Sequence, residues 1–213
     1  MALPRSGPGS GKTNILSKKG KKIMQKITFE KATHTHKNAI FEWLDKPHVR
    51  EFWDNSPEHR EDIEIFMDGR IVKTPYFHND EDFYYWVGSI DNEPYCLVMT
   101  SELIPAKCME EGSPYVPFLS KTGKTFSLDF MIGNDKHVGK GLGAPTLEAF
   151  TKFFSKEIEP ETDTYMIDPG QHNPRAQHVY AKAGFKVVGE YTSKSGYFEG
   201  GKSDIMTKKI SIG

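Results

Sequence analysis

The chain has 213 residues, of which 37% are hydrophobic and 27% are charged, and its formal net charge is −1. This balance indicates one globular domain, and no apolar run reaches the roughly 18–20 residues that span a bilayer. The N-terminus lacks the apolar stretch of a secretion signal, and the two cysteines, Cys96 and Cys108, form neither a disulfide framework nor a zinc spacing. We therefore expect a cytoplasmic protein without a membrane partner.

The charge is unevenly distributed along the chain. Residues 1–23 hold six basic residues and no acidic one, which leaves 22 basic and 29 acidic residues and a net charge of −7 in the remainder. An acidic body repels nucleic acid and attracts cations, so the partner expected is a small cationic amine and not nucleic acid. Residues 1–23 also lack apolar periodicity and are interpreted as a disordered leader or tail, with the domain spanning 24–213. Within them, Ser6–Thr13 imitates a phosphate-binding loop, but Ser6 replaces its first glycine and no strand precedes it.

The first half of the domain begins with a strand at Ile27–Lys31. A helix follows, and Pro47 should end it. Ser56 and Pro57 are a typical cap and first position for a second helix that runs toward Met67. The apolar residues that share one face of the first helix are Ala39, Ile40, Trp43 and Leu44.

A hairpin comes next, with strands at Phe83–Ile90 and Tyr95–Glu102 around the turn Asp91–Pro94. Residues 103–124 are rich in Pro, Gly and Lys and are expected to form a long loop. A strand at Phe126–Ile132 follows it.

The second half alternates between helices and strands. Asn173 caps its second helix, Pro174 takes the first position and Gly184 provides the left-handed exit. Hairpins mixed with crossover helices predict an α/β or α+β domain around one sheet. The predicted elements are a helix at Gly143–Glu157, a strand at Thr164–Ile167, a helix at Asn173–Ala183, and strands at Phe185–Tyr191 and Ser203–Ile210.

The segment Lys136–Leu147, KHVGKGLGAPTL, follows a strand and opens a helix. Glycines let the backbone approach phosphate oxygens, and the N–H groups at a helix start point toward an anion. Lys136 and Lys140 add positive charge, whereas Pro145 should delay or bend the helix start. A glycine-rich turn without a ligand is the alternative interpretation.

Lys136-x-x-Gly139-x-Gly141-x-Gly143 resembles the first motif of the GNAT acetyltransferase superfamily, and Asn173-x-x-Ala176-x-x-x-Tyr180-x-x-x-Gly184-Phe185 resembles a later one. The resemblance implies a single domain with a central mixed, mostly antiparallel twisted sheet flanked by helices. It also implies acetyl-coenzyme A as cosubstrate, with its pyrophosphate on the glycine turn and Tyr180 near its sulfur. Tyr180 would then protonate the departing thiolate; packing in the core is its alternative role. The residues expected to bind the cofactor are Phe130, Met131, Ile132, Lys136, His137, Val138, Gly139, Lys140, Gly141, Leu142, Gly143, Asn173, Ala176 and Tyr180.

The stretch Glu42–Trp53 is similar to the N-terminal helices of aminoglycoside 6'-N-acetyltransferases, and the similarity covers most of residues 26–209. Siderophore-pathway acetyltransferases that act on hydroxylated lysine share much of this pattern. The resemblance thus implies a transferase acting on a small amine, with an aminoglycoside-type acceptor as the first hypothesis. A hydroxylysine or polyamine acetyltransferase is the second hypothesis. A coenzyme A-binding sensor or scaffold is the third hypothesis. The expected oligomeric state is a monomer or a homodimer.

The acceptor side is assigned to acidic and aromatic residues. Asp129 lies in mid-strand, where aspartate is disfavoured, and it matches a carboxylate that holds or deprotonates the acceptor amine in aminoglycoside acetyltransferases. A bulge or a structural hydrogen bond is the alternative explanation of its position. Asp168 matches a second acidic position, although Asp-Pro also starts turns. Trp53 is a third candidate for the acceptor pocket, or a core residue. The eight histidines show no metal-binding spacing beside a carboxylate, so we expect no metal.

Overall fold

The fold was analysed in a computed structural model that describes residues 26–70 and 83–211. The leader expected at residues 1–23, with its loop-like stretch Ser6–Thr13, lies outside the described residues. No helix within the described ranges is long and apolar enough to cross a membrane.

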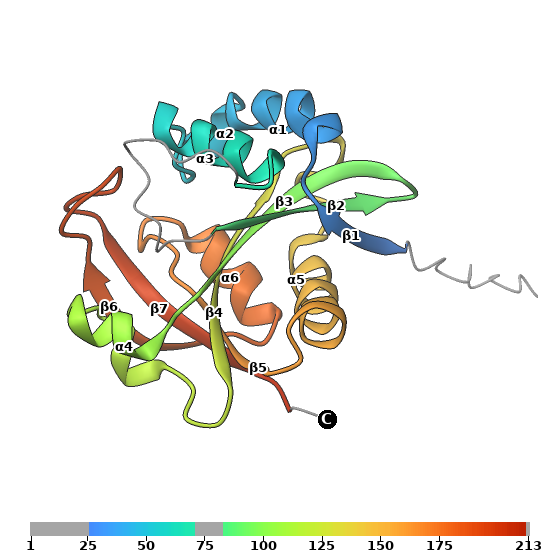
Figure 1. The fold of residues 1–213 in the computed structure, drawn as a ribbon. Helices are drawn as coiled ribbons and strands as arrows, with labels where there is room; N and C mark the ends of the chain where they lie inside the picture. Colours follow the sequence, from blue (N-terminus) through green and yellow to red (C-terminus); the bar gives the residue numbers. More distant parts are fainter. Residues whose placement is uncertain (1–25, 71–82, 212–213) are drawn as a thin grey trace, which may run out of the picture.

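A sheet of seven strands in the order β1-β2-β3-β4-β5-β7-β6 forms the centre of the described structure (Figure 1). Every neighbouring pair is antiparallel except β4 and β5, which are parallel. The mixed, mostly antiparallel sheet flanked by helices is therefore confirmed. Its strands are β1 (Ile27–Lys31), β2 (Tyr84–Ile90), β3 (Glu93–Glu102), β4 (Lys124–Ile132), β5 (Thr162–Ile167), β6 (Lys186–Thr192) and β7 (Lys202–Lys209).

Helices cover both faces of the sheet. Along β2, Tyr85 and Val87 belong to the core cluster under the N-terminal helices, whereas Trp86 belongs to the cluster under α5 and α6. Because strand side chains alternate between faces, covering both faces leaves β2 buried along almost its whole length. The helices are α1 (Lys37–Leu44), α2 (Pro47–Arg50), α3 (Pro57–Met67), α4 (Pro105–Glu110), α5 (Gly143–Phe153) and α6 (Pro174–Lys182), with short turns η1 (His34–His36), η2 (Val116–Phe118), η3 (Asp135–His137) and η4 (Phe154–Ile158).

The punctuation predicted for α3 and α6 is confirmed. The Ser56 hydroxyl accepts a hydrogen bond from the His59 backbone N–H at 3.2 Å, and the Asn173 side chain accepts one from Ala176 at 3.0 Å. Gly184 leaves α6 with φ of 93°. Each cap satisfies an N–H that the helix itself leaves unpaired.

Several local expectations are corrected by the structure. Pro145 does not delay α5, which begins at Gly143, because the N–H that proline lacks in a first turn has no helical acceptor there. Pro47 begins α2 and does not end α1, which stops at Leu44. The hairpin turn is only Asp91 and Asn92, both with positive φ, so β3 begins at Glu93. The long loop at 103–124 contains α4 and η2.

The parallel ladder between β4 and β5 is short. It runs from Lys124↔Thr162 to Ser127↔Met166 and then stops, although β4 continues to Ile132. Beyond Ser127, β4 is paired in the sheet only with β3, where Asp129 faces Met99. One edge of β4 is thereby left open where the two halves of the sheet part.

Candidate active site

A cavity of about 880 Å³ occupies the opening between β4 and β5. Its walls come from β4, the glycine turn, the start of α6, the β6–β7 loop and the segment that joins α2 to α3. The cavity brings together most of the site residues expected from the sequence: Trp53, Asp129, Phe130, Met131, Ile132, Val138, Gly139, Gly141, Leu142, Gly143, Asp168, Asn173, Ala176 and Tyr180.

The three glycines of the turn are required for different structural reasons. Gly139 and Gly141 both have φ of 74°, a left-handed conformation that other residues adopt only with strain. A Cβ at either position would meet no atom within 4 Å, so space beside the turn is open. A Cβ on Gly143 would lie 2.7 Å from Val179, so this glycine lets α5 start against α6.

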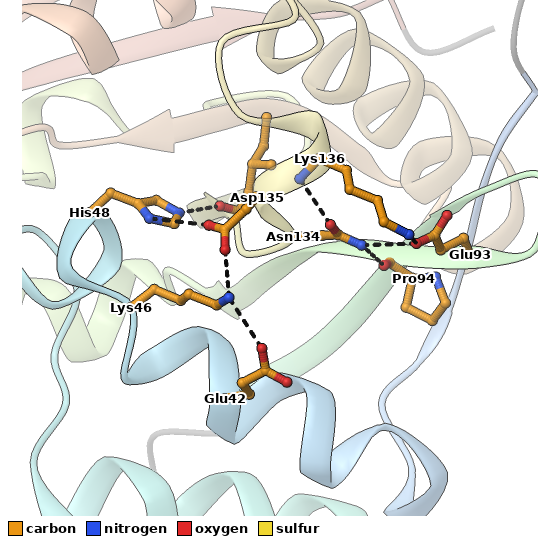
Figure 2. Close-up of polar contacts among 9 residues, drawn as sticks. Glu42, Lys46, His48, Glu93, Pro94, Asn134, Asp135 and Lys136 are labelled. Atoms are coloured by element: carbon orange, nitrogen blue, oxygen red, sulfur yellow. Dashed lines mark hydrogen bonds and ion pairs between the residues drawn. The ribbon is translucent and has the colours of Figure 1, made fainter.

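Three residues expected at the cofactor, Lys136, His137 and Lys140, do not line the cavity. Figure 2 shows Lys136 turned toward Glu93, whose carboxylate it contacts at 2.8 Å. His137 packs its ring against Tyr95, with ring centroids 5.3 Å apart. An exposed ion pair such as Lys136–Glu93 contributes little to stability. It matters here because it directs the Lys136 side chain away from the cavity.

Polar contacts hold the glycine turn to the N-terminal helices (Figure 2). Lys46 contacts Asp135 at 2.6 Å and Glu42 at 3.1 Å, and the Asp135 contact holds the pKa of that carboxyl below its usual range. His48 donates from Nε2 to the Ile132 carbonyl at 3.0 Å. These contacts join α1 and α2 to the end of β4, so the two sides of the cavity are connected through side chains.

Asp129 is a carboxyl of the cavity whose pKa is strongly raised. Burial raises its pKa to about 7, and the nearby charge of Asp168 adds to this effect. Within the described residues, no donor hydrogen-bonds to its carboxylate, so nothing offsets the desolvation. A carboxyl with a pKa near neutrality is suited to accept a proton at physiological pH.

Asp168 directly follows β5 and is held by two tyrosines. Tyr115 donates its hydroxyl to the carboxylate at 2.8 Å, and Tyr191 donates a second, short hydrogen bond. Burial raises the pKa of Asp168, while these hydrogen bonds act against the rise. The two carboxyls thus differ, because Asp168 has hydroxyl donors that Asp129 lacks.

Tyr180 is 8% exposed and lines the same cavity. Burial raises the pKa of its hydroxyl, and the charges of Asp129 and Asp168 raise it further. No side chain within the described residues is hydrogen-bonded to that hydroxyl. Tyr180 therefore stays protonated at neutral pH and has its proton available to a ligand.

Trp53 belongs to the core and also lines the cavity, so its position is compatible with both roles considered for it. Its indole N–H donates to His59 Nε2 at 2.9 Å. Burial lowers the pKa of His59, which keeps the ring neutral and Nε2 an acceptor. His59, which does not itself line the cavity, thereby fixes the orientation of the indole.

Sequence reasoning missed several lining residues. Arg175 could have been predicted from the sequence, since it lies between the two motif positions Asn173 and Ala176. The histidines and the loop residues had no local signal, because only the fold brings them to the cavity. The missed residues include His48, Glu51, Phe52, His172, Arg175, His178, Tyr191, Tyr197, Phe198 and Glu199. No cluster of three or more metal-ligating side chains occurs in the part of the chain that the structure describes.

Residues 32–193 match the protein family described as Acetyltransferase (GNAT) domain. The chain belongs to the GNAT acetyltransferase family. This acetyltransferase is 24% identical over 173 residues to the aminoglycoside N(6')-acetyltransferase type 1 of Klebsiella pneumoniae, covering 80% of this chain and 79% of that protein. The similarity to aminoglycoside 6'-N-acetyltransferases is thus confirmed.

Solved structures give the same fold. The aminoglycoside N(6')acetyltransferase of Legionella pneumophila has a TM-score of 0.64 and 21% identity, with 87% of this chain and 93% of that chain covered. AAC(6')-Ib in complex with coenzyme A and kanamycin has the same TM-score and identity, with 86% and 95% covered. Structures of AAC(6')-Ib include complexes with coenzyme A and with acetyl-CoA. At this level of identity the likeness establishes the fold, and the acceptor of this GNAT enzyme is a separate question.

Proposed function

We propose that this GNAT enzyme transfers the acetyl group of acetyl-CoA to a primary amine of a polycationic aminosugar, of the aminoglycoside type. The observation that carries the proposal is the meeting of Asp129 and Tyr180 in one cavity beside the glycine turn. One group is poised to take a proton and the other to give one. The transfer of an acetyl group to an amine needs both steps.

The donor fits the side of the cavity formed by β4 and the glycine turn. An extended pantetheine arm carries amides that can pair with the open edge of β4 at Phe130–Ile132. The pyrophosphate would lie on the backbone of Val138–Gly143, where Gly139 and Gly141 leave open space. Arg175 is the cation that we assign to the phosphates, since Lys136 is turned away to Glu93.

The acceptor fits the acidic side of the cavity. Five carboxylates line the cavity, and they come from four separate parts of the chain. A polycation can contact several of them together, whereas a single amine can contact one or two. The five are Glu51, Asp54, Asp129, Asp168 and Glu199.

The chemistry follows from the two pKa values. An ammonium group gives up a proton to Asp129, directly or through water, and the free amine attacks the thioester carbonyl. A C–N bond forms, the C–S bond breaks, and the departing thiolate takes the proton of Tyr180. The products are an acetamide and free coenzyme A. The nitrogen loses a second proton as the amide forms. One of the two protons restores Tyr180 and the other leaves to solvent, which restores ionised Asp129.

The test is release of coenzyme A thiol with three groups of acceptors: kanamycin- or tobramycin-like aminosugars, hydroxylated lysine and polyamines. We expect aminosugars to be acetylated, with binding that weakens as salt rises. Turnover of hydroxylated lysine alone would replace the aminosugar assignment with the siderophore-type one, and turnover of none, with coenzyme A bound, would favour a sensor.

Tyr180→Phe separates the acid role from packing. We expect turnover to fall on the order of 10–10⁴-fold while acetyl-CoA affinity stays close to wild type. The matched control is Tyr165→Phe, because Tyr165 is a buried tyrosine outside the cavity whose hydroxyl donates to the Thr151 carbonyl. Equal turnover in wild type and Tyr180→Phe would leave Tyr180 a packing role only.

A further inference from the structure

The loop between β6 and β7 carries two exposed aromatic side chains at the cavity. Tyr197 is 55% exposed and Phe198 is 43% exposed, yet both line the cavity that contains Asp129 and Asp168. Their rings meet edge to face, with centroids 4.9 Å apart. Adjacent aromatic rings left open to solvent at a cavity are a contact surface for a ligand that covers them.

The backbone that carries the two rings is fixed by hydrogen bonds within the loop. Ser193 donates its N–H to Gly201 and accepts from Gly200, each at 2.9 Å, which closes the base of the loop. Gly201 also donates to the Phe198 carbonyl at 2.9 Å. A loop fixed by its own backbone loses little conformational freedom when a ligand binds, so contacts with the rings contribute to affinity.

The loop belongs to the acceptor side of the cavity. It begins just after Tyr191, whose hydroxyl binds Asp168, and the base of β7 is bridged to Gly170 through Ser203. Glu199 lies next to Phe198 and also lines the cavity. The acceptor side thus combines carboxylates with aromatic faces.

That combination discriminates between acceptor classes. A linear amine, such as hydroxylated lysine or a polyamine, has charge for the carboxylates and no ring for the aromatic faces. An aminosugar of several rings has both, because each sugar ring has a face of C–H groups that can pack on an aromatic face while its ammonium groups contact the carboxylates.

We propose that Tyr197 and Phe198 stack on a second ring of the acceptor and select a cationic aminosugar of two or more rings over a one-ring or linear amine. This inference rests on the proposed function and names its acceptor class more closely. The reacting amine lies at Asp129, and the rings bind a part of the acceptor that does not react. Their loss therefore affects acceptor binding and leaves the chemical step unchanged.

The test compares wild type with the double variant Tyr197→Ser/Phe198→Ser on two acceptors, kanamycin with three rings and 6-amino-6-deoxyglucose with one. We expect the KM for kanamycin to rise about 10-fold or more, from the loss of two aromatic contacts, with kcat within about twofold. The KM values for the one-ring amine and for acetyl-CoA should stay at the wild-type level. Tyr84→Ser is the matched control, because Tyr84 is an exposed aromatic residue outside the cavity.

Three outcomes would overturn the inference while the proposed function stands. These are an unchanged kanamycin KM, an equal rise for both acceptors, and a raised KM for acetyl-CoA, which would assign the rings to the cofactor. Failure of wild type to release thiol with any aminosugar would overturn the proposed function and this inference together. Coenzyme A affinity measured by calorimetry checks that each variant is folded.

Discussion

Replacing Asp129 with asparagine should stabilise the protein at alkaline pH while it removes activity. Burial raises the pKa of Asp129 from 3.8 to about 7. The native state therefore holds this proton more tightly than the unfolded chain does. Folding stability contributed by the proton is complete below pH 3.8 and is lost as pH rises toward 7. Asparagine does not titrate, so the stability of the variant does not decrease in this way as pH rises.

The size of the effect follows from the shift. A change of roughly 3 pH units at about 1.4 kcal/mol per unit gives an upper limit of about 4 kcal/mol. Part of this loss falls below pH 5, and part of Asp129 faces the cavity, so we expect about 2 kcal/mol between pH 5 and pH 8. For a chain of this size, the Tm difference between variant and wild type should therefore be about 4–8 °C larger at pH 8 than at pH 5.

The assay is thermal unfolding of both proteins at pH 5 and pH 8, with Asp163→Asn as the control. Hydrogen bonds from Ser120, Thr122 and Thr164 hold the pKa of Asp163 below its usual range despite its burial. Asp163 is therefore ionised in the native state and the unfolded chain throughout this window, and its replacement should cause a pH-independent change. A Tm difference for Asp129→Asn that is equal at both pH values would refute the raised pKa.

Activity gives an independent readout of the same group. A base with a pKa of about 7 is roughly one-tenth ionised at pH 6 and nine-tenths at pH 8. We expect kcat/KM of wild type to rise nearly tenfold across this range. In Asp129→Asn, kcat/KM should be low and should lack this step.

Two further predictions concern cofactor and acceptor binding. Arg175→Gln should raise the KM for acetyl-CoA about 10–100-fold and leave that for acetyl-pantetheine unchanged, since only the former has phosphates to lose a charged contact. Lys136→Gln is the control and should change neither KM, and an equal effect of Arg175→Gln on both donors would remove Arg175 from the phosphates. His59→Phe should raise the acceptor KM about fivefold with little change in kcat, because Trp53 loses its hydrogen-bond acceptor at 2.9 Å. His59→Gln keeps an oxygen that can accept from Trp53 and should restore most of the affinity, so a Gln variant as weak as Phe would contradict this role.

The parts of the site that the sequence predicted are those with local causes. A helix cap, a proline at a first helical position and a glycine at positive φ are decided within a few residues. Asn173, Pro174 and Gly184 therefore predicted α6, and Gly139 and Gly141 predicted the turn. Asp129 was singled out because an aspartate in mid-strand breaks the local rule, and the structure places it at the cavity.

The parts that the sequence did not predict depend on contacts between distant segments. Lys136 is 43 positions from Glu93, and nothing near either residue indicates that they pair. Tyr115 is 53 positions from Asp168 and comes from a stretch expected to be an unstructured loop. Motif position and charge therefore assigned Lys136 to the cofactor, whereas in the structure Lys136 contacts Glu93 and Arg175 lines the cavity.

The gap between β4 and β5 accounts for the site as a whole. A parallel pair that continued past Ser127 would bury the edge of β4 in the sheet and leave no room for a ligand. Where the ladder has stopped, Asp129 lines the cavity without a hydrogen-bond donor, and burial raises its pKa. On the proposed function, a bound ammonium supplies the missing positive charge and raises the ionised fraction of Asp129 above that of the empty site. The arrangement thus links proton acceptance to acceptor binding, and an empty site holds Asp129 close to its titration midpoint at neutral pH.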